Sequence, residues 1–207
     1  MIRKLAHITS LIGHPVFVPI YGILAIVNFH LIVQSKLNAQ PKWFWVGMFV
    51  LILSLLPLMG VMFVLNKYRA PHLAQINRKE RRLAAWLLCL MYAVEFWVFN
   101  DFFFHPILKT FVLALCFSSG LLAVLNGFLK VSFHAFGWSG LFVLMLVLAQ
   151  LNAPSFVFWV LLTLLAAGIV GTSRLILGVH SSREVYTGFI TGLICNIAVY
   201  MIFYGRF

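Results

Sequence analysis

The sequence predicts an all-α protein, a polytopic bundle of about six to seven transmembrane helices, and three observations favour this fold class. Of the 207 residues, 63% are hydrophobic and 9% are charged, whereas a soluble domain carries about 25% charged residues. The mean hydropathy is +1.05. Several apolar runs reach the roughly 20 residues that a helix needs to cross a bilayer. We therefore expect lipid to be the solvent for most of the protein surface.

Seven apolar windows qualify as spans, and two prolines help to separate them. Pro106 disfavours helix at the residue before it, so it divides the apolar stretch 84–128 in two, and Pro154 marks a tight turn. The sequence shows no repeat, low-complexity tract or linker, so residues 1–207 are expected to form a single integral membrane domain. The windows are 11–33, 43–65, 84–104, 106–128, 134–151, 154–172 and 185–204.

The charge balance is strongly basic, with 15 Lys and Arg against 4 Asp and Glu, a net charge of +11. In a membrane protein, such an excess indicates loops that face anionic lipid headgroups or a site for phosphate. Nucleic-acid binding is not expected, because no soluble basic domain and no basic patch interleaved with aromatic residues is present. The cysteines Cys89, Cys116 and Cys195 lie far apart within apolar segments, which favours buried thiols over a disulfide framework or a metal site.

Seven crossings would place alternate loops on the same side of the membrane. The N-terminus, the loop 66–83, the link 129–133 and the stretch 173–184 share one side, here named side A, and the remaining loops lie on side B. Side A carries eleven of the fifteen basic residues, which the positive-inside rule would place in the cytoplasm. Some of these cations are expected to belong to the candidate site and so to inflate the count, and without seven of them the two sides are equal. These seven are Arg78, Lys79, Arg81, Arg82, Lys130, Arg174 and Arg183.

The stretch SRLILGVHSSRE, residues 173–184, gathers titratable groups at the end of an apolar segment. His180 and Glu184 are four residues apart and would share one face of a helix. A carboxylate bonded to one imidazole nitrogen fixes the tautomer and leaves the other nitrogen as a nucleophile or base. Arg174 adds a planar fork of donors suited to phosphate. The stretch therefore predicts a catalytic site, although basic loop residues at a membrane surface also serve topology alone.

These residues resemble the third motif of the type 2 phosphatidic acid phosphatase superfamily, which reads S-R-x5-H-x3-D. Ser173, Arg174 and His180 match in register, and Glu184 stands where the family has Asp. The segment 188–192, GFITG, also resembles the family, since its small residues would let helices approach closely.

The other two motifs of that superfamily are matched less well. The second motif, P-S-G-H, corresponds to residues 131–134, which read VSFH and keep Ser and His. The first motif, K-x6-R-P, is nearly absent: Arg82 could stand for its Arg, but Leu83 replaces Pro and Gln75 replaces Lys. The family-like core covers about residues 66–192.

The resemblance implies a role for each matched residue. His180 would attack phosphorus to give a phosphohistidine, with Glu184 orienting its ring. His134 would protonate the leaving alkoxide, and Arg174 would clamp the phosphate. The resemblance implies no metal and no other cofactor, and side A offers no carboxylate cluster that would hold magnesium.

Further cations could stabilise the charge that develops in phosphoryl transfer. On their chemistry alone we expect Lys130, Arg81 and Arg82 to supplement Arg174, and we place Ser132, retained from the second motif, with them as a phosphate-binding residue. Phe133 takes the place of the family's Gly and restricts the backbone there.

The leading hypothesis is a metal-independent lipid phosphatase of the inner (cytoplasmic) membrane, acting on a phosphate monoester or diphosphate of a membrane lipid. Two alternatives stay open. One is an inactive family member that binds a lipid phosphate. The other is a small transporter that uses Glu95, a carboxylate near the middle of a span, where charge is costly. The family resemblance favours a site on the periplasmic side. His14, His30 and His105 have no acidic neighbour and are assigned no chemistry.

Overall fold

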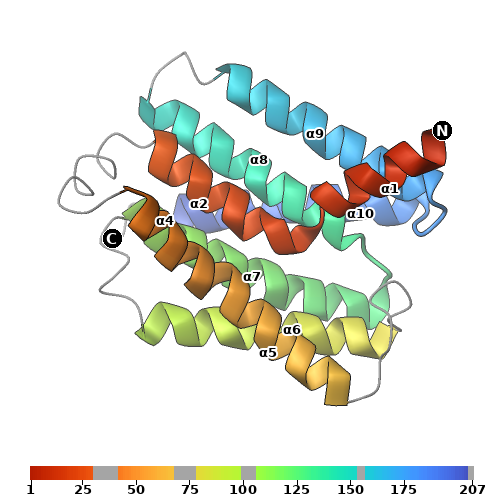
Figure 1. Cartoon of the computed structure of the whole chain (residues 1–207), viewed down its shortest axis with the longest axis horizontal. Coiled ribbons are helices and arrows are strands. Elements are labelled where there is room, and N and C mark those ends of the chain that lie inside the picture. The colour runs from red at the N-terminus through yellow and green to blue at the C-terminus, as the bar shows by residue number, and fades with distance from the viewer. Residues whose placement is uncertain (30–41, 68–77, 99–105, 153–156, 205–207) are drawn as a thin grey trace.

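The computed structural model describes residues 1–29, 42–67, 78–98, 106–152 and 157–204, which form an all-α polytopic bundle with no strand in these ranges (Figure 1). Six helical segments of the described chain are long and apolar enough to cross a membrane. The protein is therefore a multi-pass membrane protein, as its composition predicts. The segments are Ile2–Asn28, Phe44–Phe63, Pro106–Phe128, Phe133–Leu151, Val157–Ile176 and Ser182–Phe203.

The first span begins at Ile2 rather than at residue 11 and is broken near its middle. Helix α1 (Ile2–Ile12) is followed by the 3-10 turn η1 (Pro15–Phe17) and by α2 (Val18–Phe29). His14 has an extended backbone, with φ −63° and ψ 135°, the conformation that a following proline favours. The predicted window 11–33 started too late because polar residues in α1 interrupt the apolar run, and its residues 30–33 lie outside the described ranges.

The second span contains an irregular turn. Helix α4 (Lys42–Val50) continues through a π-helical turn, η3 (Leu51–Leu55), into α5 (Leu56–Lys67). The extra residue in such a turn offsets the helix faces before and after it. The candidate span, Phe44–Phe63, matches the predicted window 43–65.

The third predicted window, 84–104, corresponds to α6 (Arg78–Val98) and is not among the six candidate spans. Its first five residues, RKERR, are charged, and residues 99–104 lie outside the described ranges. Helix α6 nevertheless packs along α7 (Pro106–Phe128) (Figure 1). Pro106 begins α7, so the predicted division at this proline is confirmed.

Helices α8 (Phe133–Asn152), α9 (Val157–Ile176) and α10 (Ser182–Phe203) complete the bundle. Figure 1 shows the N-terminus, the start of α6, the link from α7 to α8 and the link from α9 to α10 at the same end of the bundle. The predicted grouping of these segments on side A therefore agrees with the arrangement of the described helices.

The largest apolar core lies in the half of the bundle toward side B. It combines buried side chains of α2, α4, η3, α7 and α8, among them Ile26, Phe49, Leu108 and Leu144. These residues come from the ends of their helices nearest side B, and the buried polar residues Ser10, Ser132 and His134 lie toward side A, outside this core.

Two glycines bring α10 directly onto the backbone of α8. A Cβ atom added at Gly188 would lie 2.7 Å from the carbonyl oxygen of Ser132. A Cβ atom added at Gly192 would lie 2.7 Å from the carbonyl oxygen of Phe136 and would also meet the Ser139 hydroxyl. The close helix approach predicted from residues 188–192 is thus confirmed. It brings the start of α10 against the start of α8.

We expect Gly192→Ala to destabilise the protein, because its new methyl group would press on backbone atoms of α8. Overpacking of this kind costs about 1–3 kcal/mol, more than the roughly 1 kcal/mol that alanine gains over glycine in a helix. Gly168→Ala on α9 is the matched control, since a Cβ atom there would meet nothing within 4 Å. Thermal unfolding in detergent should show a lower Tm for Gly192→Ala and an equal or higher Tm for Gly168→Ala. Equal Tm values for both variants would contradict the packing described.

Candidate functional site

Six polar residues from α1, α8, α9, α10 and the two side-A links gather at one end of the bundle, and we name them the side-A cluster. The contacts among them join residues up to 164 positions apart in the sequence. Four members are the residues predicted to carry the chemistry, one is a predicted supplementary cation, and one was not predicted. The members are Ser10, Lys130, His134, Arg174, His180 and Glu184.

The predicted pair of His180 and Glu184 is present, but its local structure differs from the expected helix. The Nδ1 atom of His180 lies 2.7 Å from Oε2 of Glu184. His180 precedes α10, which begins at Ser182, and Glu184 occupies the third position of that helix. The Glu184 carboxylate also accepts from the Ser181 backbone N–H at 3.3 Å, while the Ser181 hydroxyl accepts from the Glu184 N–H. This reciprocal capping box starts α10 and fixes the carboxylate beside the imidazole.

The capping box gives a physical reason for Glu184 where the phosphatase motif has Asp. A capping box pairs Ser or Thr at the helix N-cap with Glu or Gln three residues later. Here that side chain both reaches back to the N-cap backbone and receives the imidazole. One carboxylate therefore starts the helix and orients His180.

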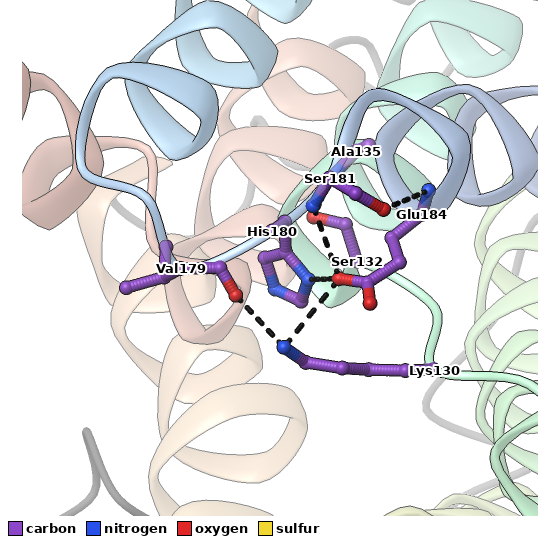
Figure 2. A network of polar contacts seen from close by, with 7 residues as sticks. All are labelled: Lys130, Ser132, Ala135, Val179, His180, Ser181 and Glu184. Carbon is purple, nitrogen blue, oxygen red and sulfur yellow. Dashed lines mark hydrogen bonds and ion pairs between the residues drawn. The ribbon is translucent and has the colours of Figure 1, made fainter.

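Lys130 and Ser132 tie the link before α8 to the link before α10. Lys130 Nζ lies 3.5 Å from Glu184 Oε2 and donates to the carbonyl oxygen of Val179 at 3.0 Å. Figure 2 shows Glu184 Oε2 approached from His180, Ser181 and Lys130. The Ser132 N–H donates to the Glu184 carbonyl oxygen at 3.2 Å. The buried Ser132 hydroxyl accepts from the backbone of residue 135 at 3.5 Å, so it caps α8.

The environment of His180 favours its neutral form. Burial lowers the pKa of His180, the hydrogen bond that its ring donates to Glu184 raises it in part, and the charges of Arg174 and Lys130 lower it again. The net pKa lies below the ordinary value of 6.5. With the Nδ1 proton directed at Glu184, Nε2 on the opposite edge of the ring keeps its lone pair at neutral pH.

The structure brings Arg81, rather than Arg82, toward the cluster. Burial lowers the pKa of Arg81, the Glu184 carboxylate raises it and the Arg78 charge lowers it, so Arg81 and Glu184 interact electrostatically. Within the described residues the buried Nε of Arg81 has no hydrogen-bond partner. Arg82 is exposed and lies beside Gly127. Arg78 donates to the carbonyl oxygens of Asn126 at 2.9 Å and Gly127 at 2.7 Å, which satisfies the end of α7.

His134 is buried at the start of α8 and turns toward α1. Its Nε2 lies 3.2 Å from the Ser10 carbonyl oxygen and 3.5 Å from the Ser10 hydroxyl. Arg174 Nη1 donates to the same hydroxyl. The His14 and His134 rings meet edge to face, with centroids 5.1 Å apart. His134 interacts electrostatically with both Arg174 and His180. The two histidines predicted to share a site therefore lie near each other and near Arg174.

Sequence reasoning missed Ser10 and gave His14 no role. Both lie in the segment HITSLIGHP, residues 7–15, where polar residues interrupt an apolar run before Pro15. Polar side chains beside a proline that interrupts a membrane span could have pointed to these residues. The predicted span began at residue 11, so Ser10 fell outside it.

The cluster has the composition of an anion site. It combines one oriented imidazole, a second buried imidazole and Arg174, whose buried Nε has no hydrogen-bond partner among the described residues. A buried donor without an acceptor is costly, and a phosphate oxygen would supply that acceptor. In the part of the chain that the structure describes, no three His, Cys, Asp or Glu side chains come together as metal ligands.

Comparisons of the chain with protein-family models, with curated proteins and with solved structures find no match. The likeness to the phosphatase superfamily therefore rests on the motif residues of the sequence alone.

Opposite shifts in the pKa of His180 are expected from two substitutions. Glu184→Gln should lower that pKa, because it removes the anion that stabilises the imidazolium while keeping the capping box. Lys130→Met should raise it, because it removes a cation beside the ring. Histidine-labelled protein can be titrated by NMR, with His180→Gln to assign the signal.

Arg183→Met is the control for this pair, since Arg183 is an exposed cation in the same first turn of α10. Its effect on the His180 signal should be smaller than that of Lys130→Met. Shifts of the same sign for Glu184→Gln and Lys130→Met would contradict the electrostatics described.

Proposed function

We propose that the protein is a metal-independent phosphatase that hydrolyses the phosphate monoester or diphosphate of a membrane lipid through a phosphohistidine. The observation that carries the proposal is the 2.7 Å contact between His180 and Glu184, beside a second histidine and a guanidinium with an unfilled donor. This is the set of groups that phosphoryl transfer to a histidine requires: an oriented nucleophile, a proton donor and charge stabilisation.

In the first step, the lone pair on His180 Nε2 attacks phosphorus. The N–P bond forms, the bond from phosphorus to the lipid oxygen breaks, and the leaving oxygen takes a proton from His134, which enters this step as the imidazolium stabilised by the bound phosphate dianion. Glu184 accepts the Nδ1–H of His180 and stabilises the positive charge that grows on the ring. Arg174 holds the phosphoryl oxygens, and Arg81 and Lys130 add positive charge nearby.

In the second step, water attacks the phosphohistidine. His134, now neutral, takes a proton from the water, the N–P bond breaks, and inorganic phosphate leaves. His180 returns to its neutral form with its proton still directed at Glu184. The two steps balance without a metal ion or a redox partner.

A lipid suits this site because the cluster lies at the end of the transmembrane helices. An acyl or prenyl chain can stay among apolar helices while its headgroup reaches the cations. Phosphatidic acid, phosphatidylglycerol phosphate, polyprenyl diphosphate and lipid A phosphate are the substrate classes that fit. We place the protein in the inner (cytoplasmic) membrane with the cluster toward the periplasm. This orientation follows from the family resemblance.

His180→Ala should abolish phosphate release from these lipids, by at least about a thousand-fold, as expected when the nucleophile is lost. His7→Ala is the matched control, because His7 is exposed on α1. Purified protein is assayed for phosphate release, and labelled substrate is used to trap the phosphoryl group on the protein. Release that survives in His180→Ala would refute the mechanism. A wild-type protein that binds these lipids without releasing phosphate would instead indicate the inactive lipid-phosphate binder.

Glu95 supports a second candidate function, a small transporter. Glu95 is buried in α6, and neither of its carboxylate oxygens has a hydrogen-bond partner among the described residues. Carboxylates within a membrane often lie on an ion or proton pathway. The phosphatase proposal gives this residue no part in the chemistry.

Glu95→Gln separates these two functions. If the protein is a phosphatase, the variant should release phosphate at a rate within about twofold of wild type, since a remote substitution that keeps shape changes little. If it is a transporter, Glu95→Gln should abolish substrate counterflow in liposomes, whereas His180→Ala should leave it unchanged. Loss of phosphate release in Glu95→Gln, with Tm unchanged, would contradict the assignment of the chemistry to the side-A cluster alone.

A further inference from the structure

Ser10 connects the N-terminal helix to two residues of the proposed phosphate site. Its hydroxyl accepts a hydrogen bond from Arg174 Nη1, and its carbonyl oxygen lies 3.2 Å from His134 Nε2. Ser10, His134 and Arg174 are all buried or half-buried and come from three different helices. No motif of the resembled family includes this residue.

The position of α1 is fixed by packing and by hydrogen bonds on both sides of the helix break between α1 and η1. A Cβ atom added at Gly13 would meet the side chain of Val170 on α9, so α1 ends in close contact with that helix. The Trp138 indole N–H of α8 donates to the Gly13 carbonyl oxygen at 2.8 Å. The Tyr21 hydroxyl donates to the Ile12 carbonyl oxygen at 2.8 Å. Ser10 is therefore held against α8 and α9.

The contact with Ser10 determines which edge of the Arg174 guanidinium stays available. A guanidinium presents two parallel N–H bonds, from Nε and Nη2, along the edge that binds carboxylate or phosphate in a bidentate manner. Ser10 engages Nη1, which lies outside this edge. The Nε atom is buried and has no partner among the described residues. The hydroxyl thus holds the guanidinium by Nη1 and leaves the buried Nε, one of the two donors of the bidentate edge, without a partner in the described chain.

The same residue sets the tautomer of His134. When the Nε2 proton of His134 is donated to the Ser10 carbonyl oxygen, the lone pair of the neutral ring lies on Nδ1. That nitrogen is then the one that takes up and gives a proton. This second contact uses the backbone of Ser10 and does not depend on its side chain.

We infer that Ser10 is a positioning residue of the phosphate site: its hydroxyl presents the Arg174 fork to a phosphate group, and its carbonyl anchors His134. The inference rests on the proposed function and adds α1 to the site. Its two halves are separable, because substitution of the side chain removes the hydroxyl that Arg174 binds, whereas the shorter, 3.2 Å contact between His134 and the Ser10 carbonyl oxygen remains.

The test compares Ser10→Ala, Ser10→Thr and the control Thr9→Ala, which removes a hydroxyl from the neighbouring position of α1. Binding of inorganic phosphate and of dihexanoyl phosphatidic acid to the full-length protein in detergent is measured by calorimetry. Ser10→Ala should weaken both by about tenfold, the usual effect of a hydrogen bond to a charged group. Ser10→Thr keeps the hydroxyl and should stay within a few-fold of wild type. Thr9→Ala should bind as wild type does.

Two further readouts separate positioning from a merely structural effect. In an Arg174→Lys background, Ser10→Ala should cause no additional loss of binding, because its action passes through the guanidinium. Ser10→Ala should raise KM and leave the pH dependence of kcat unchanged, because the carbonyl contact with His134 persists. If the Ala variant has a lowered Tm, Ser10→Cys repeats the test with a side chain of similar size that accepts hydrogen bonds weakly.

Phosphate binding that is unchanged or tighter in Ser10→Ala would overturn the inference, since Ser10 would then be irrelevant to the anion or would compete with it. An equal loss in the Arg174→Lys background would overturn it as well. If binding responds to Ser10 as expected but no variant releases phosphate from a lipid, the phosphatase proposal fails while the role of Ser10 stands.

Discussion

The carboxylate of Glu184 is the interaction on which the side-A end of the bundle depends. It receives the His180 imidazole at 2.7 Å, the Ser181 N–H at 3.3 Å and the Lys130 ammonium at 3.5 Å. Its backbone carbonyl receives the N–H of Ser132. A single residue therefore begins α10, orients the candidate nucleophile and joins the two side-A links. The loss of this side chain would affect the start of α10 and the orientation of His180 together, so the residue at this position is constrained twice.

Glu184 makes these contacts only because helix packing brings its partners close to it. Gly188 and Gly192 let α10 lie against the backbone of α8, which places Ser132 opposite the first turn of α10. On the other side of α8, the break between α1 and η1 puts the end of α1 against His134. The side-A cluster thus forms where three local features meet: the capped start of α10, the two glycines of α10 and the helix break before Pro15. Side chains of the surrounding helices keep these elements in place.

The sequence predicted the parts of this arrangement that depend on local spacing. Six of the seven predicted spans, the division at Pro106 and the pairing of His180 with Glu184 follow from apolar length and from residue spacing, and each is found. The contribution of α1 was not predicted, because contacts between residues more than a hundred positions apart depend on tertiary packing. The same limit explains Arg81 and Arg82: the motif pointed to Arg82, whereas the helix register turns Arg81 toward Glu184. The charged first turn of α6 likewise belongs to the site end of the bundle and not to a span.

The side-A cluster, together with Arg81, carries more positive than negative charge. Arg174 and Lys130 lie in the cluster with one carboxylate, and Arg81 interacts with that carboxylate from α6. Two of these cations, Arg81 and Arg174, keep a buried Nε without a partner in the described chain, an arrangement that costs free energy in the absence of an acceptor. Buried donors without a partner call for a physical explanation, such as a role in binding. A dianionic phosphate headgroup would balance the excess positive charge and supply acceptors for donors of this kind.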